Sequence, residues 1–152
     1  MSVGSGVKLD LGQLIAWGEE LGRAAVRHRV FVALEGPLGA GKTTLVRAAC
    51  DGAGLAGPVT SPTFTLIHRY GAQDHVYHVD LYRIASPDEL EELGWDDLTN
   101  GEHTVFVEWA GQAGDLLPVD RWTIRLDIAD GGSVRTAEFE RHGRAPAIPV
   151  PR

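Results

Sequence analysis

Apolar residues recur at helical spacing near the start of the chain: Leu11, Leu14, Ile15, Leu21 and Ala25. Asp10 and Gln13 stand at the two positions of a reciprocal capping box just before and within this set. Gly12, Gly18 and Gly22 weaken the prediction, because glycine costs about 1 kcal/mol relative to alanine inside a helix. We nevertheless expect a helix that follows Asp10.

Continuous apolar runs predict two buried strands in the middle of the chain. Val30–Glu35 is apolar up to its last residue, and Thr104–Val107 leads into Glu108 in the same way. A helix-compatible run from Thr44 to Cys50 lies between them and is expected to end within the next few residues.

Two further pairs of runs have the lengths and turn residues of antiparallel hairpins. Phe64–Tyr70 and His75–Asp80 are joined by four residues that begin with Gly71. Trp122–Ile128 and Val134–Glu140 flank an Asp-Gly-Gly sequence. Hairpin strands combined with crossover helices predict an α/β domain with a mixed, partly antiparallel sheet.

A further helix start is predicted at residues 86–89. Ser86-Pro87-Asp88-Glu89 has the form of a capping box with proline in the first turn, and Leu90 and Leu93 form the core side. We interpret the acidic residues of this segment as a solvated helix face, with a binding surface as the alternative: Asp88, Glu89, Glu91 and Glu92.

Length and composition favour one globular domain. The chain has 152 residues, and we expect the domain to span 1–140. The prolines at 146, 149 and 151 predict a flexible C-terminal segment at 141–152. Cys50 is the only cysteine, so no internal disulfide can form and a reducing compartment is expected.

Charge and hydropathy restrict the partners. No stretch approaches the roughly 20 apolar residues that span a bilayer, so we expect a cytoplasmic protein with no membrane partner. The formal net charge of −7 opposes a direct grip on a nucleic-acid backbone. Any role in RNA metabolism is therefore expected to run through a partner protein.

Residues 36–43 read Gly-Pro-Leu-Gly-Ala-Gly-Lys-Thr, a complete G-x-x-x-x-G-K-[ST] phosphate-binding sequence between a predicted strand and a predicted helix. The glycines allow positive φ angles and close backbone approach, while a Gly-rich structural turn is the alternative. Lys42 is expected to reach the β- and γ-phosphates, and Thr43 to offer its hydroxyl to Mg²⁺. The residues predicted to bind the nucleoside triphosphate are Leu38, Gly39, Ala40, Gly41, Lys42, Thr43 and Thr44.

Two acidic residues at predicted strand ends complete the candidate catalytic set. Glu108 follows a buried apolar run, where a carboxylate can reach Mg²⁺ directly or through water, although an exposed strand-end residue is the alternative. Asp80 closes the run before Leu81 and is a candidate for orienting the attacking water or for contacting Mg²⁺ indirectly, as a neighbour of its ligands. Capping of the following turn would explain Asp80 equally well.

Three other features are open to more than one interpretation. Ser61 and Thr63 flank a proline and form either a loop that senses the γ-phosphate or an ordinary turn. Trp109 is either a neighbour of the nucleotide or a core residue. The histidines are not interpreted as a metal site, because His75 and His78 face opposite sides of a predicted strand and one cysteine cannot build a zinc site.

Five segments together resemble the TsaE (YjeE) family of ATPases, in order and spacing, from about residue 10 to residue 128. They are GPLGAGKTTLVRA, TSPTFTLIHRY, YHVDLYR, VFVEWA and the LLP that follows. The resemblance implies a three-layer P-loop NTPase-type α/β domain with ATP and Mg²⁺ as cofactors. It also implies a role in threonylcarbamoyladenosine synthesis in tRNA, with a TsaB–TsaD heterodimer as the partner and tRNA met only through that complex.

The resemblance also implies roles for single residues. Lys42 and Thr43 would serve phosphate and Mg²⁺, Glu108 the metal, and Asp80 catalysis or water orientation. Ser61 and Thr63 would belong to a switch-like loop, and Trp109 would be the aromatic neighbour of the acid.

The chain departs from the family pattern at two places. Pro37 stands where many members have Asp, and Gly111-Gln112 stands where an Arg often follows the Glu-Trp pair. We expect these changes to alter loop stiffness or partner contacts rather than activity. A small-molecule kinase and a nucleotide-dependent binding module with negligible hydrolysis are the alternative functions.

Overall fold

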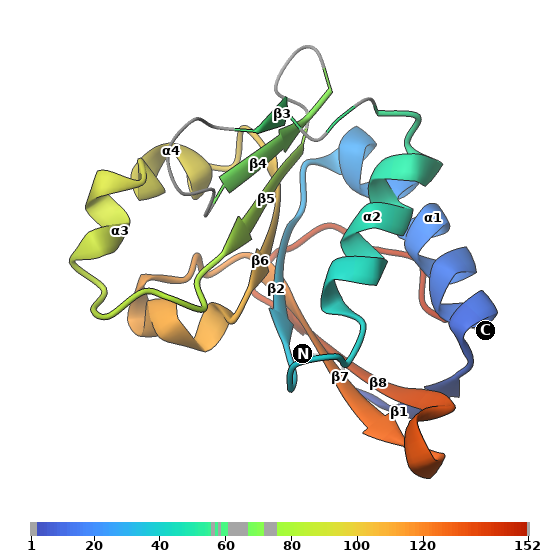
Figure 1. The fold of residues 1–152 in the computed structure, drawn as a ribbon. Coiled ribbons are helices and arrows are strands. Elements are labelled where there is room, and N and C mark those ends of the chain that lie inside the picture. Colours follow the sequence, from blue (N-terminus) through green and yellow to red (C-terminus); the bar gives the residue numbers. More distant parts are fainter. Residues whose placement is uncertain (1–2, 56, 58, 61–66, 72–75, 152) are drawn as a thin grey trace.

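The computed structural model describes residues 3–55, 57, 59–60, 67–71 and 76–151, and these form one eight-stranded sheet with helices on both faces (Figure 1). The strand order is β1-β8-β7-β2-β6-β5-β4-β3. The strands are β1 (Val3–Leu9), β2 (Phe31–Glu35), β3 (Val59–Thr60), β4 (Ile67–Tyr70), β5 (Val76–Asp80), β6 (Thr104–Glu108), β7 (Arg121–Ala129) and β8 (Val134–His142). The helices are α1 (Leu11–His28), α2 (Lys42–Gly52), α3 (Glu89–Glu92), α4 (Trp95–Leu98) and the 3₁₀ segments η1 (Ala110–Leu116) and η2 (Asp130–Gly132).

The sheet is mixed, as the sequence predicts. Its centre is parallel, with β2 between β6 and β7 and β5 beyond β6. The two hairpins, β4–β5 and β7–β8, are antiparallel. Strand β1 was not predicted, because its Gly-Ser-Gly sequence lacks a strand pattern; it pairs antiparallel with β8 across an irregular register between Gly4 and Val7.

The central strands are buried on both faces, which explains their continuous apolar runs. On one face, α1 and α2 cover Val32 and Leu34 of β2 and Phe106 of β6. On the other face, α3, α4 and η1 cover Phe31 and Ala33 of β2 and the valines of β6. The alternation of neighbouring residues between the two cores fixes the face on which each strand-end side chain lies.

Helices α1 and α2 touch through glycines. A Cβ at Gly22 would lie 1.8 Å from the carbonyl oxygen of Ala49, and one at Gly18 would lie 2.6 Å from the Cβ of Ala48. A Cβ at Gly52 of α2 would lie 2.3 Å from the carbonyl oxygen of Glu19 in α1. Gly18 and Gly22, two of the three glycines that weaken the helix prediction, are therefore required by packing.

The capping prediction for α1 is confirmed. Asp10 Oδ1 accepts from the Gln13 backbone N–H at 2.8 Å, and Gln13 Oε1 accepts from the Asp10 N–H at 2.9 Å. The box predicted at Ser86 is wrong, because the Glu89 carboxylate accepts from the Ala85 N–H at 3.1 Å and not from the Ser86 N–H. The resulting helix α3 has only four residues. The acidic side chains of α3 face solvent or are half-buried, as expected for a solvated face.

The segment predicted to be a flexible tail, 141–152, is packed over its described part. Ala145 and Ile148 are buried in the core beneath α1 and α2. Two indoles hold the proline-rich backbone: Trp122 Nε1 donates to the Pro146 carbonyl at 2.7 Å and Trp17 Nε1 to the Pro149 carbonyl at 2.8 Å. Prolines lack an N–H, but their carbonyls remain free to accept these bonds, and a composition-based prediction misses this.

None of the helices in the described part of the chain is both long enough and apolar enough to cross a bilayer.

We expect Gly22→Ala to lower the free energy of unfolding by about 3 kcal/mol, because the new methyl group meets the α2 backbone, which has little room to move. Gly12→Ala is the matched control: Gly12 lies exposed on the same helix, and alanine there should leave stability unchanged or raise it by up to about 1 kcal/mol. Chemical denaturation of both variants measures the difference. Equal stabilities would contradict the close contact of α1 and α2.

We expect Cys50 to resist alkylation in the folded protein. The thiol lies on α2 with 2% of its surface exposed, and burial, reinforced by Asp51, raises its pKa to about 12. Iodoacetamide at pH 8 should therefore react roughly a hundredfold or more slowly with the native protein than with protein unfolded in guanidinium. Mass spectrometry follows the adduct, and comparable rates in the two states would contradict the burial.

Candidate functional site

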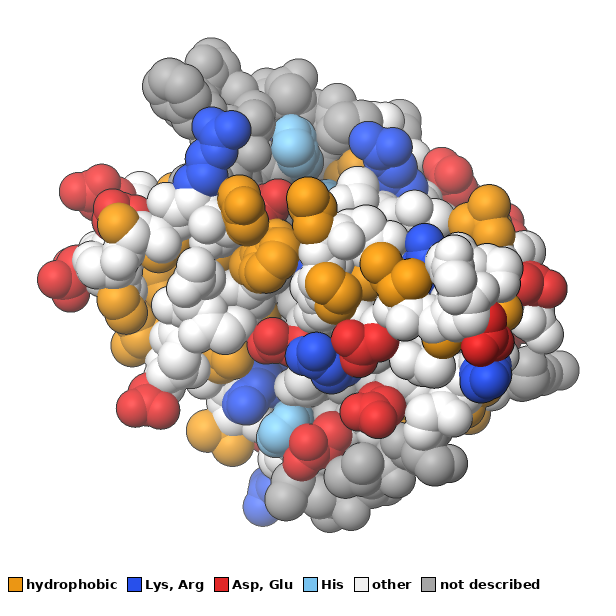
Figure 2. Space-filling view, turned by 60° about the horizontal axis from the view of Figure 1, so that its bottom comes forward, with side chains coloured by type: hydrophobic (Ala, Val, Ile, Leu, Met, Phe, Trp, Pro, Cys, Tyr) orange, Lys and Arg blue, Asp and Glu red, His pale blue; other side chains and the backbone are white. Residues whose placement is uncertain are grey.

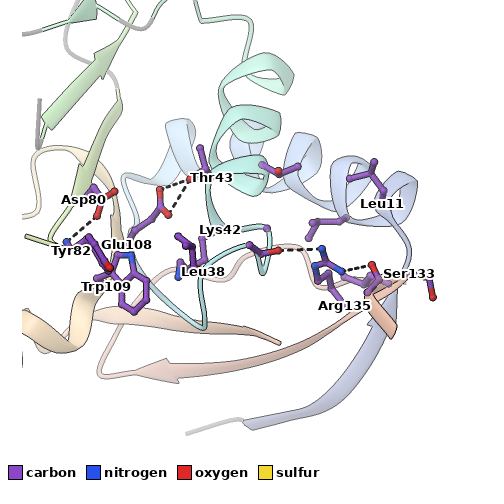
Figure 3. A pocket seen from close by; sticks show the side chains of 16 residues that line it. Leu11, Leu38, Lys42, Thr43, Asp80, Tyr82, Glu108, Trp109, Ser133 and Arg135 are labelled. Atoms are coloured by element: carbon purple, nitrogen blue, oxygen red, sulfur yellow. Dashed lines mark hydrogen bonds between the residues drawn. The ribbon is translucent and has the colours of Figure 1, made fainter. Parts of the chain in front are cut away.

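The candidate catalytic residues meet at one edge of the sheet because the central strands are parallel. Asp80 ends β5 and pairs in register with Glu108 at the end of β6. Strand β2 ends beside them, and the phosphate loop leads from it into α2, whose first residues are Lys42 and Thr43. Figure 3 shows Lys42, Thr43, Asp80 and Glu108 around one cavity of about 410 Å³.

The phosphate loop has the backbone geometry that its glycines predict. The φ angles of Gly36, Gly39 and Gly41 are 135°, 81° and 107°. At Gly36 a Cβ would lie 2.1 Å from the Leu126 carbonyl oxygen, so that position also requires glycine for space. Gly41 is the N-cap of α2 and has no side chain to accept from the first-turn N–H groups. These donors and the positive end of the helix dipole therefore face an anion site.

Lys42 is held against the loop. It is 4% exposed, and its Nζ donates to the carbonyl oxygens of Gly36 and Pro37, the latter at 3.3 Å. The same ammonium lies 3.9 Å from the centre of the Trp109 ring. Burial lowers the pKa of Lys42, and the nearby charges of Glu108 and Asp80 oppose this shift.

Glu108 is buried, in contrast to the exposed strand-end residue of the alternative interpretation. It is 4% exposed, and its two carboxylate oxygens accept from Thr43 Oγ1 at 3.1 and 2.9 Å. His78 Nε2 lies 2.5 Å from Oε2. Burial alone would raise the pKa of Glu108, but the hydrogen bonds from His78 and Thr43 and the charge of Lys42 outweigh it and lower the pKa below its ordinary value. The carboxylate is therefore ionised at neutral pH.

Asp80 has the capping role that one of the sequence interpretations predicts, and it also faces the cavity. Its Oδ1 accepts from the Tyr82 backbone N–H at 2.9 Å, which caps the turn after β5. The half-buried side chain also lines the cavity beside Glu108. The turn thus holds a carboxylate at the cavity wall.

Trp109 has a left-handed backbone conformation, with φ 57° and ψ 40°. This conformation costs a bulky residue roughly 1–2 kcal/mol, so the surrounding structure must stabilise it. The ring packs against Tyr82, with ring centres 5.0 Å apart, and lines the cavity. Trp109 is therefore a wall of the site rather than a residue of the deep core.

Of the residues predicted to bind the nucleotide, all that the structure describes line the cavity except Ala40. Those that line the cavity are Leu38, Gly39, Gly41, Lys42, Thr43, Thr44 and Trp109. Ala40 is fully buried beneath the loop, where its N–H donates to the Pro37 carbonyl at 3.1 Å. Ser61 and Thr63 lie outside the described residues.

One wall of the cavity was missed because it comes from segments distant in sequence. Leu9, Leu11 and Leu14 reach it from the junction of β1 and α1. Arg135 of β8 donates to the Gly39 carbonyl of the phosphate loop at 3.1 Å and to the Gly132 carbonyl at 2.8 Å. No local motif marks these residues, because they reach the loop only through the pairing of β1, β8 and β7.

The mouth of the cavity is apolar. Leu38 is 78% exposed, Leu11 63% and Tyr82 56%. Figure 2, which turns the lower end of Figure 1 toward the viewer, shows hydrophobic side chains gathered near the middle of this face, with charged side chains around them. An apolar rim next to an anion site suits a ligand with one flat apolar end and one phosphorylated end.

The donor set suits Mg²⁺ together with phosphate. Among the described residues, no three His, Cys, Asp or Glu side chains cluster in the way that a metal site built from protein ligands alone needs. The Thr43 hydroxyl and the Glu108 carboxylate lie in contact beside the anion site, and Mg²⁺ is commonly bound by one or two protein oxygens plus phosphates. The residues present therefore fit a metal that arrives with a nucleotide.

Comparison with known sequences gives one consistent family. The family model described as "Threonylcarbamoyl adenosine biosynthesis protein TsaE" matches residues 10–137. The tRNA threonylcarbamoyladenosine biosynthesis protein TsaE of Haemophilus influenzae is 42% identical over 102 residues, which are 66% of this chain and 65% of that protein. Proteins of the same name from Bacillus subtilis and Streptomyces coelicolor are 44% identical over 113 residues and 39% identical over 130 residues. These matches cover 72% and 81% of this chain, and 68% and 85% of those proteins.

A solved structure agrees with the sequence matches. The crystal structure of Bacillus subtilis YdiB superposes with a TM-score of 0.67 at 27% identity. The superposition covers 94% of this chain and 89% of YdiB. The similarity therefore extends beyond the motif segments to both cores of the sheet.

Proposed function

The chain belongs to the TsaE family and so has its role in tRNA threonylcarbamoyladenosine biosynthesis; from this premise we propose that it is a Mg²⁺-dependent ATPase. The observation that carries the proposal is the contact of Thr43 with Glu108 at the mouth of the phosphate loop. A loop that binds phosphate needs only backbone donors and Lys42. A buried, ionised carboxylate on the adjacent hydroxyl adds what hydrolysis requires, a fixed acidic group beside the metal position.

The phosphate loop and Lys42 bind the triphosphate in this proposal. The first-turn N–H groups of α2 receive the phosphate oxygens, and Lys42 exchanges its carbonyl partners for them. Phosphate is the better partner, because its negative charge attracts the ammonium directly, whereas the carbonyl groups are neutral dipoles. Trp109 excludes water from one side of the ammonium.

Thr43 and Glu108 would hold Mg²⁺, which would neutralise negative charge on the triphosphate. Asp80, fixed by the Tyr82 N–H, would accept a hydrogen bond from the attacking water. The apolar rim of Leu11, Leu38 and the leucines behind it would take the adenine base. Ser61 and Thr63 are assigned to a loop that responds to the γ-phosphate, on the basis of the family resemblance alone.

We assign the coupling of this activity to a TsaB–TsaD-type heterodimer in the cytoplasm. The net charge of −7 supports contact with tRNA only through that complex. Hydrolysis that is slow in the isolated protein and faster in the complex would link ATP turnover to the modification cycle.

We expect Lys42→Ala to weaken ATP binding at least tenfold, because it removes the buried ammonium that lies against the phosphate loop. Lys8→Ala is the matched control, since Lys8 is the other lysine of the chain, forms an exposed pair with Asp130 and does not line the cavity. Isothermal titration calorimetry with ATP and Mg²⁺ compares them. An unchanged affinity in Lys42→Ala would contradict the assignment of the loop.

We expect Mg-ATP turnover, measured as free phosphate, to be weak for the protein alone and clearly stimulated by the TsaB–TsaD pair. Glu108→Gln should retain nucleotide binding and lose turnover by about a hundredfold or more, because metal positioning matters most in the transition state. Glu91→Gln, an exposed change on α3, should leave turnover unaltered. Normal turnover in Glu108→Gln would refute the metal assignment, and transfer of phosphate to an added metabolite would favour a kinase.

A further inference from the structure

His78 is a buried polar residue that the proposed mechanism does not use. It lies in β5 with 6% of its surface exposed and does not line the nucleotide cavity. Its Nε2 is 2.5 Å from Oε2 of Glu108, and no other hydrogen bond of its ring is recorded among the described residues. Burying an imidazole requires a partner, and here that partner is the carboxylate of the active site.

Strand geometry explains why these two side chains meet. Residues two apart on a strand share a face, so His78 lies on the same face of the sheet as Asp80. Asp80 is in register with Glu108 on the neighbouring parallel strand, which places Glu108 on that face as well. His78 lies two residues before Asp80 on β5 and therefore reaches Glu108 from the side that faces away from the carboxyl ends of the strands.

The hydrogen bond has a definite direction. An ionised carboxylate can only accept, so the proton must be on Nε2 and the imidazole must donate. Thr43 Oγ1 has a single proton, which both carboxylate oxygens share. His78 thus supplies the second donor, and it comes from the sheet, whereas Thr43 belongs to helix α2.

Building on the proposed function, we infer that His78 is a positioning residue that fixes the rotamer of Glu108 for metal binding. The hydrogen bond from its Nε2 to Oε2 fixes the carboxylate in the orientation that faces Thr43 and the anion site. His78 contacts neither the nucleotide nor the metal. Partners of this kind typically contribute tenfold to hundredfold to metal affinity, because a ligand that is already oriented loses less freedom on binding.

Three substitutions separate this role from simple core packing. His78→Gln places an amide nitrogen at the reach of Nε2 and keeps the donor. His78→Asn keeps the polarity but reaches only as far as Nδ1. His78→Leu keeps approximate volume and has no donor. His68→Leu is the matched control, because His68 lies next to His78 on β4, with ring centres 6.1 Å apart, and has no recorded hydrogen bond to Glu108.

Calorimetry on the full chain measures the affinity for ADP, once with Mg²⁺ and once with EDTA, and the ratio of the two affinities is the tightening by Mg²⁺. The melting temperature of each variant is measured alongside. We expect His78→Leu and His78→Asn to bind ADP in EDTA like the wild type but to lose about tenfold to hundredfold of the tightening by Mg²⁺. His78→Gln should recover most of that tightening, and His68→Leu should retain it.

Two results would overturn the inference. One is full Mg²⁺-dependent tightening in both His78→Asn and His78→Leu; if the leucine variant does not fold, the comparison of Asn with Gln decides. The other is equal loss in Gln, Asn and Leu that follows their melting temperatures, as a purely structural role predicts. If instead the wild-type protein shows no Mg²⁺-dependent tightening, the proposed function itself fails.

Discussion

The arrangement of the candidate site depends on one buried carboxylate. Glu108 sits at the end of β6 with almost no contact with water, and an ionised group in such a place is stable only when donors surround it. Thr43 reaches it from α2 and His78 from β5, and the charge of Lys42 adds to both. The two donors come from different elements, so the carboxylate joins the first turn of α2 to the sheet.

Local chemistry explains which parts could be predicted from sequence. The glycines at 36 and 41 and the capping pair at Asp10 act over a few residues, and the structure has the geometry that they predict. The continuous apolar strands were recognisable because burial on both faces leaves no alternation. The family resemblance adds the chemical roles, which pattern alone left open between alternatives.

The features that sequence reasoning missed depend on long-range pairing or on competing signals. Strand β1 forms because β8 offers an edge, and its own residues do not favour it. Arg135 reaches Gly39 only once the β7–β8 hairpin is folded. From the sequence, no role is predicted for His78, although its spacing of two from Asp80 puts both side chains on the same face of the strand. This period of two is the signal from which its place beside the site is predictable.

The glycine contact between α1 and α2 has a mechanical consequence. Two helices whose backbones touch have no side-chain layer between them to deform, so they cannot shift past each other in small steps. A displacement of the first turn of α2 therefore moves α1 with it, because the two helices behave as one rigid body. The first turn of α1 carries Leu11 and Leu14 at the opposite wall of the cavity. A movement at the phosphate-binding end of the cavity is therefore coupled to a movement at its apolar end.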